Sequence, residues 1–187
     1  MDLLLSIGIG IGLSAACGFR VFVPLLGINI AAMSGHLELA QGFEWMGTNT
    51  AFAALLVATL LEIAAYYIPF VDNLLDTIAT PAAFIAGTLA TASVVGDTSA
   101  LLQWALALIA GGGTAGTVQV GTVAVRGASS MATAGTGNAA VATAEDAGSV
   151  VLTVLALVLP LVAVVLAAFL VFRLVKRRIR RSKASKY

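Results

Sequence analysis

The uncharged apolar run at residues 148–172 constrains the fold of this chain more than any other feature of its sequence. At about 1.5 Å per residue, a helix over this run is long enough to cross a hydrocarbon core about 30 Å thick. The chain has 187 residues, of which 60% are hydrophobic and 10% charged, and its mean hydropathy is +1.03. A soluble domain of this size cannot bury so much apolar surface. The sequence therefore predicts an all-α integral membrane protein.

Two further apolar segments have the length and composition of membrane helices. One is residues 51–68, and the other is residues 81–96, which begins with Pro81, a residue favoured at the first position of a helix. Pro160, near the middle of the run at 148–172, is expected to kink that helix.

Two more apolar regions are interrupted before either half reaches a spanning length. Residues 2–34 break around "CGFR", and residues 100–125 break at the three glycines of "GGG". Interrupted backbone is stable at membrane depth only where protein shields it or where it lines a wet cavity. Residues 100–125 form either one crossing or a re-entrant hairpin. We favour the hairpin, because it places the polar segment 34–50, which has no lysine or arginine, outside the cell.

These segments together predict about five to seven membrane segments, including one or two broken or re-entrant helices. The sequences "SAACGFRVFVPLL" and "TAGTVQVGTVAV" both place an apolar strip after small residues. This likeness indicates either a weak inverted repeat or the chance similarity of small-residue segments. Residues 127–148, which are rich in Ala, Gly, Ser and Thr, are predicted to form a loop.

Positive charge is concentrated at the end of the chain, since Arg20 and Arg126 are the only basic residues before position 173. We therefore divide the chain into a single transmembrane helical domain, residues 1–175, and a basic tail, residues 176–187, which is cytoplasmic by the positive-inside rule. The tail is expected to contact anionic lipid headgroups. No nucleic-acid partner is expected.

The candidate site centres on Asp72 and Asp76, which are four residues apart and would share one face of a helix, with Asn73 alongside. Repulsion between the two carboxylates is relieved by a cation, a neighbouring arginine or a shared proton. Glu62 could complete a set of oxygen ligands, so Asp72, Asp76 and Glu62 are tentative metal ligands. Alternatively, the segment lies at the membrane interface, where Asp72 caps a helix and binds no ligand.

Arg20 lies in an apolar stretch and needs an anionic partner. That partner is either one of the three carboxylates above or the phosphate or carboxylate of a substrate. Arg126, Asn138 and Glu145 are secondary candidates, because helix packing could bring them to the same cavity.

Other chemistry finds little support in the sequence. Cys17 is the only cysteine and His36 the only histidine, which excludes an internal disulfide and a Cys/His zinc cluster. No serine lies in a nucleophile-elbow pattern. We expect no enzyme activity and no cofactor other than a bound cation.

The segments "GLSAACGFRVFVPLL", "LEIAAYYIPFVDNLLDTIATPAAFIAG" and "RGASSMATAGTGNAAVATAED" resemble a family of small bacterial and plant membrane proteins, domain of unknown function 4126. The resemblance extends over nearly the whole chain, and the segment with Asp72 and Asp76 is its most specific part. It implies a multi-pass architecture without implying an activity. We expect a location in the bacterial cytoplasmic membrane, with the C-terminus in the cytoplasm.

Two functions fit these features. The first is a small transporter or permease, homo-oligomeric and linked to cations or protons, with a polar carboxylate site at membrane depth. The second is a non-transporting scaffold or lipid-interacting protein, including one that flips phospholipids, whose buried charges only hold helices together.

Overall fold

A computed structural model describes residues 3–68 and 71–184, and the regular elements in this part of the chain are all helical. The prediction of an all-α protein is therefore confirmed. The elements in chain order are α1 (Leu3–Cys17), α2 (Phe22–Met33), the 3-10 helix η1 (Glu44–Gly47), α3 (Asn49–Tyr66), α4 (Val71–Val94), α5 (Ala100–Leu106), the π-helix η2 (Ala107–Gly112), α6 (Gly113–Thr133), α7 (Asn138–Val158) and α8 (Pro160–Ala184).

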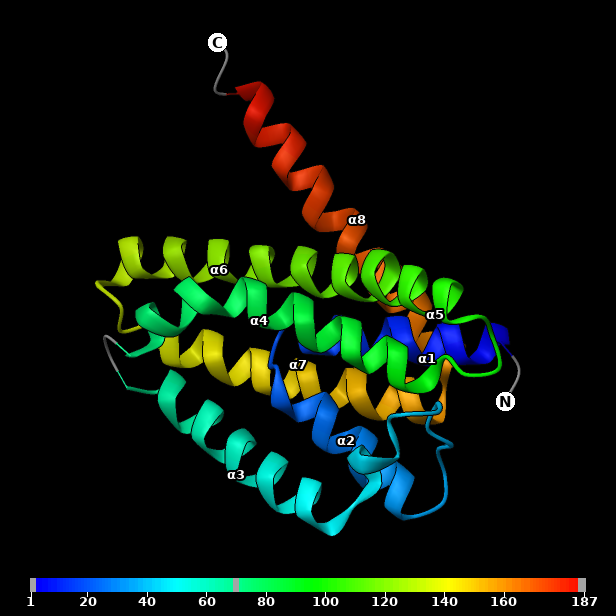
Figure 1. Ribbon diagram of the computed structural model, residues 1–187. Helices are drawn as coiled ribbons and strands as arrows, with labels where there is room; N and C mark the ends of the chain where they lie inside the picture. Colours follow the sequence, from blue (N-terminus) through cyan, green and yellow to red (C-terminus); the bar gives the residue numbers. More distant parts are fainter. Residues whose placement is uncertain (1–2, 69–70, 185–187) are drawn as a thin grey trace.

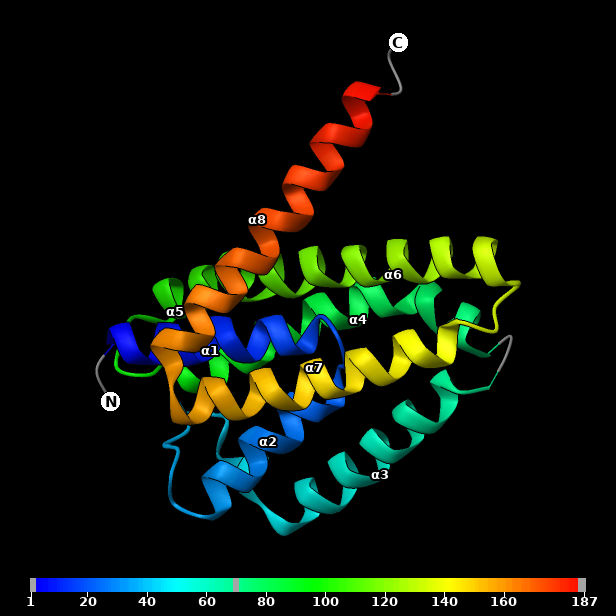
Figure 2. The same cartoon turned by 180° about the vertical axis from the view of Figure 1, so that it is seen from behind.

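Four of the described helical segments are long and apolar enough to cross a membrane. They are Asn49–Tyr66, Leu74–Val94, Ala100–Thr133 and Asn138–Val158. In Figures 1 and 2, α4, α6 and α7 lie side by side and α3 flanks them. Large apolar side chains on the outer faces of these helices are exposed, as expected for surfaces that contact lipid.

The break predicted within residues 2–34 is confirmed. α1 ends at Cys17, the chain turns, and α2 begins at Phe22 and runs back toward the end of the bundle where α1 begins (Figure 1). Gly18 is required at this turn, because a Cβ atom there would lie 2.7 Å from the carbonyl oxygen of Ala115 on α6. α1 and α2 thus form a helical hairpin whose tip lies inside the bundle.

The preferred hairpin at residues 100–125 is wrong. The chain remains helical from α5 through η2 into α6, and the predicted break is instead a stretch of π-helix over Ala107–Gly112. The glycines serve helix packing, since a Cβ atom on Gly111 would lie 2.6 Å from the carbonyl oxygen of Gly87 on α4. The segment "TAGTVQVGTVAV" also lacks a break, so the likeness behind the inverted repeat does not extend to the structure.

Three other predicted boundaries are corrected. Residues 127–148 are helical except for a short turn, in which Ala134 has a φ of 52° and Gly135 a φ of 87°. Residues 148–172 are divided between two helices, because the chain leaves helical geometry at Leu159 and Pro160 begins α8, where its missing amide has no cost. Pro81 lies inside α4, where the contacts of the first two turns with α6 and α7 outweigh the missing hydrogen bond.

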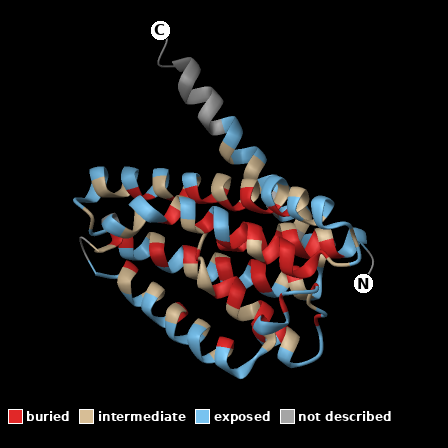
Figure 3. Ribbon diagram, viewed as in Figure 1, coloured by how far each residue is buried: buried red, intermediate tan, exposed pale blue. Residues whose placement is uncertain are grey.

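The core lies where α1, α4, α7 and η2 meet (Figure 3). Many of its side chains are small, including those of Ala83, Ala86, Ala90 and Ala115, and this allows the helix backbones to approach closely. α8 packs on α1 at its start and then diverges from the bundle (Figures 1 and 2).

Candidate functional site

Two buried arginines enclose an aromatic ring at the tip of the α1–α2 hairpin. Arg20 follows α1, Tyr66 is the last residue of α3, and Arg126 lies on α6. The guanidinium carbons of Arg20 and Arg126 lie 4.0 Å and 3.9 Å from the centroid of the Tyr66 ring. Both arginines are almost inaccessible to solvent, with exposed fractions of 1% and 3%. Stacking on the ring stabilises both cations, but it does not neutralise them.

Glu145 on α7 is the carboxylate that joins the two arginines. Its Oε2 atom lies 3.0 Å from Nη1 of Arg20, and its Oε1 atom accepts a hydrogen bond of 3.1 Å from Nε of Arg126. Nη2 of Arg126 also donates to Oε2. Glu145, a secondary candidate in the sequence, therefore lies at the centre of the site.

Asp146 is the second partner of Arg20. Nε of Arg20 donates to Oδ1 of Asp146 at 2.5 Å, and the hydroxyl of Tyr67 donates to Oδ2 at 3.1 Å. The expectation that Glu62, Asp72 or Asp76 pairs with Arg20 is therefore corrected. Sequence reasoning did not select Asp146, although its position next to Glu145 in an apolar stretch was a usable signal.

Asp72 and Asp76 share one face of α4, as their spacing predicts, and this face is directed at α6 and α7. Oδ2 of Asp72 accepts a hydrogen bond of 3.0 Å from Nδ2 of Asn138, which also donates to Oγ of Ser130 at 2.9 Å. One turn further along α4, Oδ1 of Asp76 lies 3.6 Å from Nη1 of Arg126. Because α6 carries both Ser130 and Arg126, it connects the Asp72–Asn138 pair to the arginine cluster.

Three buried side-chain atoms of these described residues have no hydrogen-bond partner in the protein. They are Oδ1 of Asp76, Nη1 of Arg126 and Oδ1 of Asn138. Asn138 is only 5% exposed. Leaving such an atom without a partner costs about 1–3 kcal/mol, so the arrangement favours a small polar ligand or a proton there.

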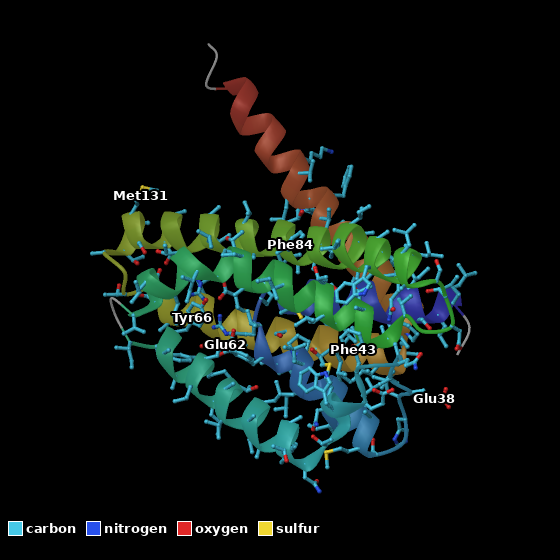
Figure 4. All side chains as sticks on the ribbon, in the orientation of Figure 1. Glu38, Phe43, Glu62, Tyr66, Phe84 and Met131 are labelled. Carbon is cyan, nitrogen blue, oxygen red and sulfur yellow. The ribbon has the colours of Figure 1, made fainter. Side chains whose placement is uncertain are left out.

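Glu62 has a different role from the expected one. Its Oε1 accepts a hydrogen bond of 2.7 Å from the backbone N–H of Val21, and its Oε2 one of 3.0 Å from that of Phe22. It therefore caps the first turn of α2 from α3, where a negative charge also interacts favourably with the helix dipole. Figure 4 shows Glu62 and Tyr66 in the interior between α3 and the rest of the bundle.

The expected metal set of Glu62, Asp72 and Asp76 is not brought together. In the described part of the chain, no three His, Cys, Asp or Glu side chains are grouped so as to hold a metal ion. Asp72 and Asp76 instead contact Asn138 and Arg126. The side chain of Asn73, which was expected beside them, lies outside the described residues.

Removal of the Glu62 cap is expected to destabilise the hairpin. Glu62→Ala leaves the N–H groups of Val21 and Phe22 without an acceptor, and we expect the free energy of unfolding to fall by about 1–2 kcal/mol. Glu62→Gln retains an amide oxygen and should lose less. Chemical denaturation in detergent micelles measures both changes, and equal stability of Glu62→Ala and the wild type would contradict the capping role.

The cluster as a whole carries more acidic than basic groups. Its carboxylates outnumber its guanidinium groups by five to two. The acidic members are Glu62, Asp72, Asp76, Glu145 and Asp146, and the basic members are Arg20 and Arg126. A small apolar cavity of about 220 Å³ lies between α6, α7 and α8, and Glu145 is one of its lining residues.

Comparison with known proteins gives a match to a protein family. The family model described as "Domain of unknown function (DUF4126)" matches residues 7–178, which include α2 to α7 and all seven charged residues of the cluster. No curated protein and no solved structure matches the chain. Because the match covers most of the chain, the protein belongs to the DUF4126 family.

Proposed function

We propose that the protein is a small membrane transporter or permease in which the buried ionic cluster takes up a proton or a cation. The observation that carries this proposal is the excess of carboxylates over guanidinium groups in a cluster whose members are all buried or half-buried. One charge at the centre of a membrane costs about 2.5–3.5 kcal/mol. An excess of carboxylates that are buried or half-buried therefore favours the uptake of protons or cations. The proposal includes no enzymatic step.

The interruption between α1 and α2 supports the same function. Transporters commonly build their sites at breaks in helices, where backbone groups are free to bind ligands near the middle of the membrane. Here the break carries Arg20, and the first N–H groups of α2 are directed at Glu62. We infer that α1 and α2 form a re-entrant hairpin whose tip completes the site.

This arrangement also gives a consistent topology. In the proposal, α3, α4, the α5–α6 run and α7 cross the membrane, and α8, which diverges from the bundle after packing on α1, makes a fifth crossing (Figure 1). The segment 34–50 and the basic tail then lie on opposite sides. The tail is cytoplasmic by the positive-inside rule, and the segment without lysine or arginine lies outside.

Asp76 is the group we assign to proton or cation uptake. Its Oδ1 atom lies 3.6 Å from Nη1 of Arg126, which is longer than a hydrogen bond. Neither of these two atoms has a hydrogen-bond partner. Asp72, Asn138 and Ser130 form a polar layer one helical turn away from Asp76. This layer lies on the side of Asp76 that is closer to the loop between α6 and α7. Protons or ions would enter through this polar layer.

Ion flux into liposomes tests the proposal. The purified protein is reconstituted, a potassium diffusion potential is imposed with valinomycin, and internal pH is followed with a dye across a panel of external cations. We expect flux with the wild type and loss of most of it in Asp76→Asn. The control is Asp97→Asn, which changes an exposed residue with a φ of 53°, a backbone conformation that asparagine also adopts. Wild-type flux from a folded Asp76→Asn protein would exclude this role.

A non-transporting scaffold is the second candidate, and the contacts of Glu145 with both arginines favour it. In that case the charges only hold α1, α6 and α7 together. No flux would be observed, and no cation would raise the thermal stability of the wild type more than that of Asp72→Asn/Asp76→Asn. For the transporter, a cation that binds the folded protein should raise the stability of the wild type alone.

In either case we propose a homo-oligomer, whose outward apolar faces pair.

A further inference from the structure

An apolar groove on the outside of the bundle lies apart from the ionic cluster. It has a volume of about 1060 Å³ and runs between α4, α6 and α8. Phe84 and Ile85 form its wall on α4, and Leu174 and Val175 contribute from α8. In Figure 4, Phe84 lies between α4 and α6. The described residues that line the groove are all uncharged.

The floor of the groove is open because glycines form it. A Cβ atom on Gly113 would have no neighbour within 4 Å, and one on Gly116 would have only a Phe84 ring carbon, at 3.7 Å. Both glycines line the groove. An extended hydrocarbon chain fits such a surface, since pockets of this size hold ligands that are largely apolar.

Positive charge lies directly beside the groove. Arg173 and Lys176 flank Leu174 and Val175 in the sequence of α8, and the cations lie 5.0 Å and 5.5 Å from the ring centroids of Phe169 and Phe172. The sequence continues as "RRIRRSKASKY", and no acidic residue follows position 160. An apolar groove is thus bordered by a helix that carries only positive side-chain charge.

We propose that the groove binds an acyl chain of an anionic phospholipid, whose phosphate is held by Arg173 and Lys176. Apolar walls suit the chain, and the cations suit the phosphate. A second copy of the protein is a poorer occupant, because seating its α8 in the groove would bring two basic helices together. The site is independent of the proposed transport function, since none of its lining residues belongs to the ionic cluster.

Lipid binding to the full-length protein in mild detergent tests this site. Phosphatidylglycerol and phosphatidylcholine with the same acyl chains are titrated, and bound lipid is measured by native mass spectrometry. We expect tighter binding of phosphatidylglycerol. Arg173→Ala/Lys176→Ala should weaken it roughly 30-fold, since each basic residue near an anionic surface contributes about 1 kcal/mol.

A second variant fills the groove and leaves the charge unchanged. Gly113→Leu/Gly116→Leu should abolish tight binding of phosphatidylglycerol. Gly127→Leu is the matched control, because it lies on the same helix, also has no neighbour within 4 Å of a Cβ atom, and does not line the groove. Glycerol 3-phosphate, which carries the phosphate without acyl chains, should not compete with the lipid.

Several outcomes would overturn the site. Equal affinity for the two lipids would show that Arg173 and Lys176 do not hold the phosphate. Unchanged affinity after the groove is filled would show that the lipid binds elsewhere. Competition by glycerol 3-phosphate would indicate a phosphate site that needs no acyl chain. Conversion of an oligomer to a monomer by Gly113→Leu/Gly116→Leu, with lipid affinity unchanged, would identify the groove as an interface between copies. If this variant fails to fold, the charge variant and the competition still decide the question.

Discussion

Replacing Glu145 with glutamine is expected to lower the free energy of unfolding by about 3–5 kcal/mol, because it leaves two buried guanidinium groups without the carboxylate that both contact. Arg20 and Arg126 are each at most 3% exposed, so water cannot replace the lost charge. Glutamine keeps the shape of the side chain, and the effect is therefore one of charge and hydrogen bonding. Chemical unfolding in detergent micelles measures the loss.

The control for this experiment is Glu38→Gln, which makes the same chemical change at an exposed residue before η1 and should alter stability by no more than about 0.5 kcal/mol. Adding Arg126→Met to Glu145→Gln removes one of the two cations that lose this carboxylate, so the double variant should be more stable than Glu145→Gln alone. A loss below about 1 kcal/mol for Glu145→Gln would mean that the cluster does not depend on this carboxylate.

Gly111→Ala is expected to cost about 3 kcal/mol, because the new methyl group would overlap both side chain and backbone of α4. Its Cβ would lie 2.6 Å from the carbonyl oxygen of Gly87 and would also overlap the side chain of Thr91. A backbone oxygen cannot rotate away, so η2 and α4 would have to separate. The resulting loss is measured by thermal or chemical unfolding.

Gly113→Ala, two residues later, is the matched control. A Cβ atom there has no neighbour within 4 Å, and alanine favours the helix over glycine by up to about 1 kcal/mol. The control should therefore be neutral or stabilising. Similar losses for both variants would show that glycine is needed for the backbone conformation of this region and not for the approach of α4.

The same two glycines show why the prediction for residues 100–125 failed. A glycine cluster in an apolar segment is compatible with a break in the helix or with close helix packing, and local sequence does not distinguish the two. The outcome depends on what lies opposite. Here Gly87 and Thr91 of α4 face Gly111, so the glycines remain in a helix and allow the contact.

For the charged residues as well, local sequence predicted one part of the arrangement and could not predict the other. The spacing of Asp72 and Asp76 is a local property of a helix, so the sequence correctly placed them on one face. The partners of Arg20 could not be found in this way, because Glu145 is 125 residues away in the chain and several carboxylates competed for the same role. Glu62 was expected to be a ligand, but the position of α2 against α3 makes it a helix cap.

Sequence alone was sufficient for the membrane class, the helical architecture, the break after Cys17 and the family, because these depend on apolar length, residue composition and local backbone preference. Tertiary packing was needed for the composition of the ionic cluster, the continuity of the α5–α6 run and the apolar groove. These features depend on which helix faces meet. Many small-residue and apolar surfaces of this chain are nearly equivalent in sequence, and only their packing selects among them.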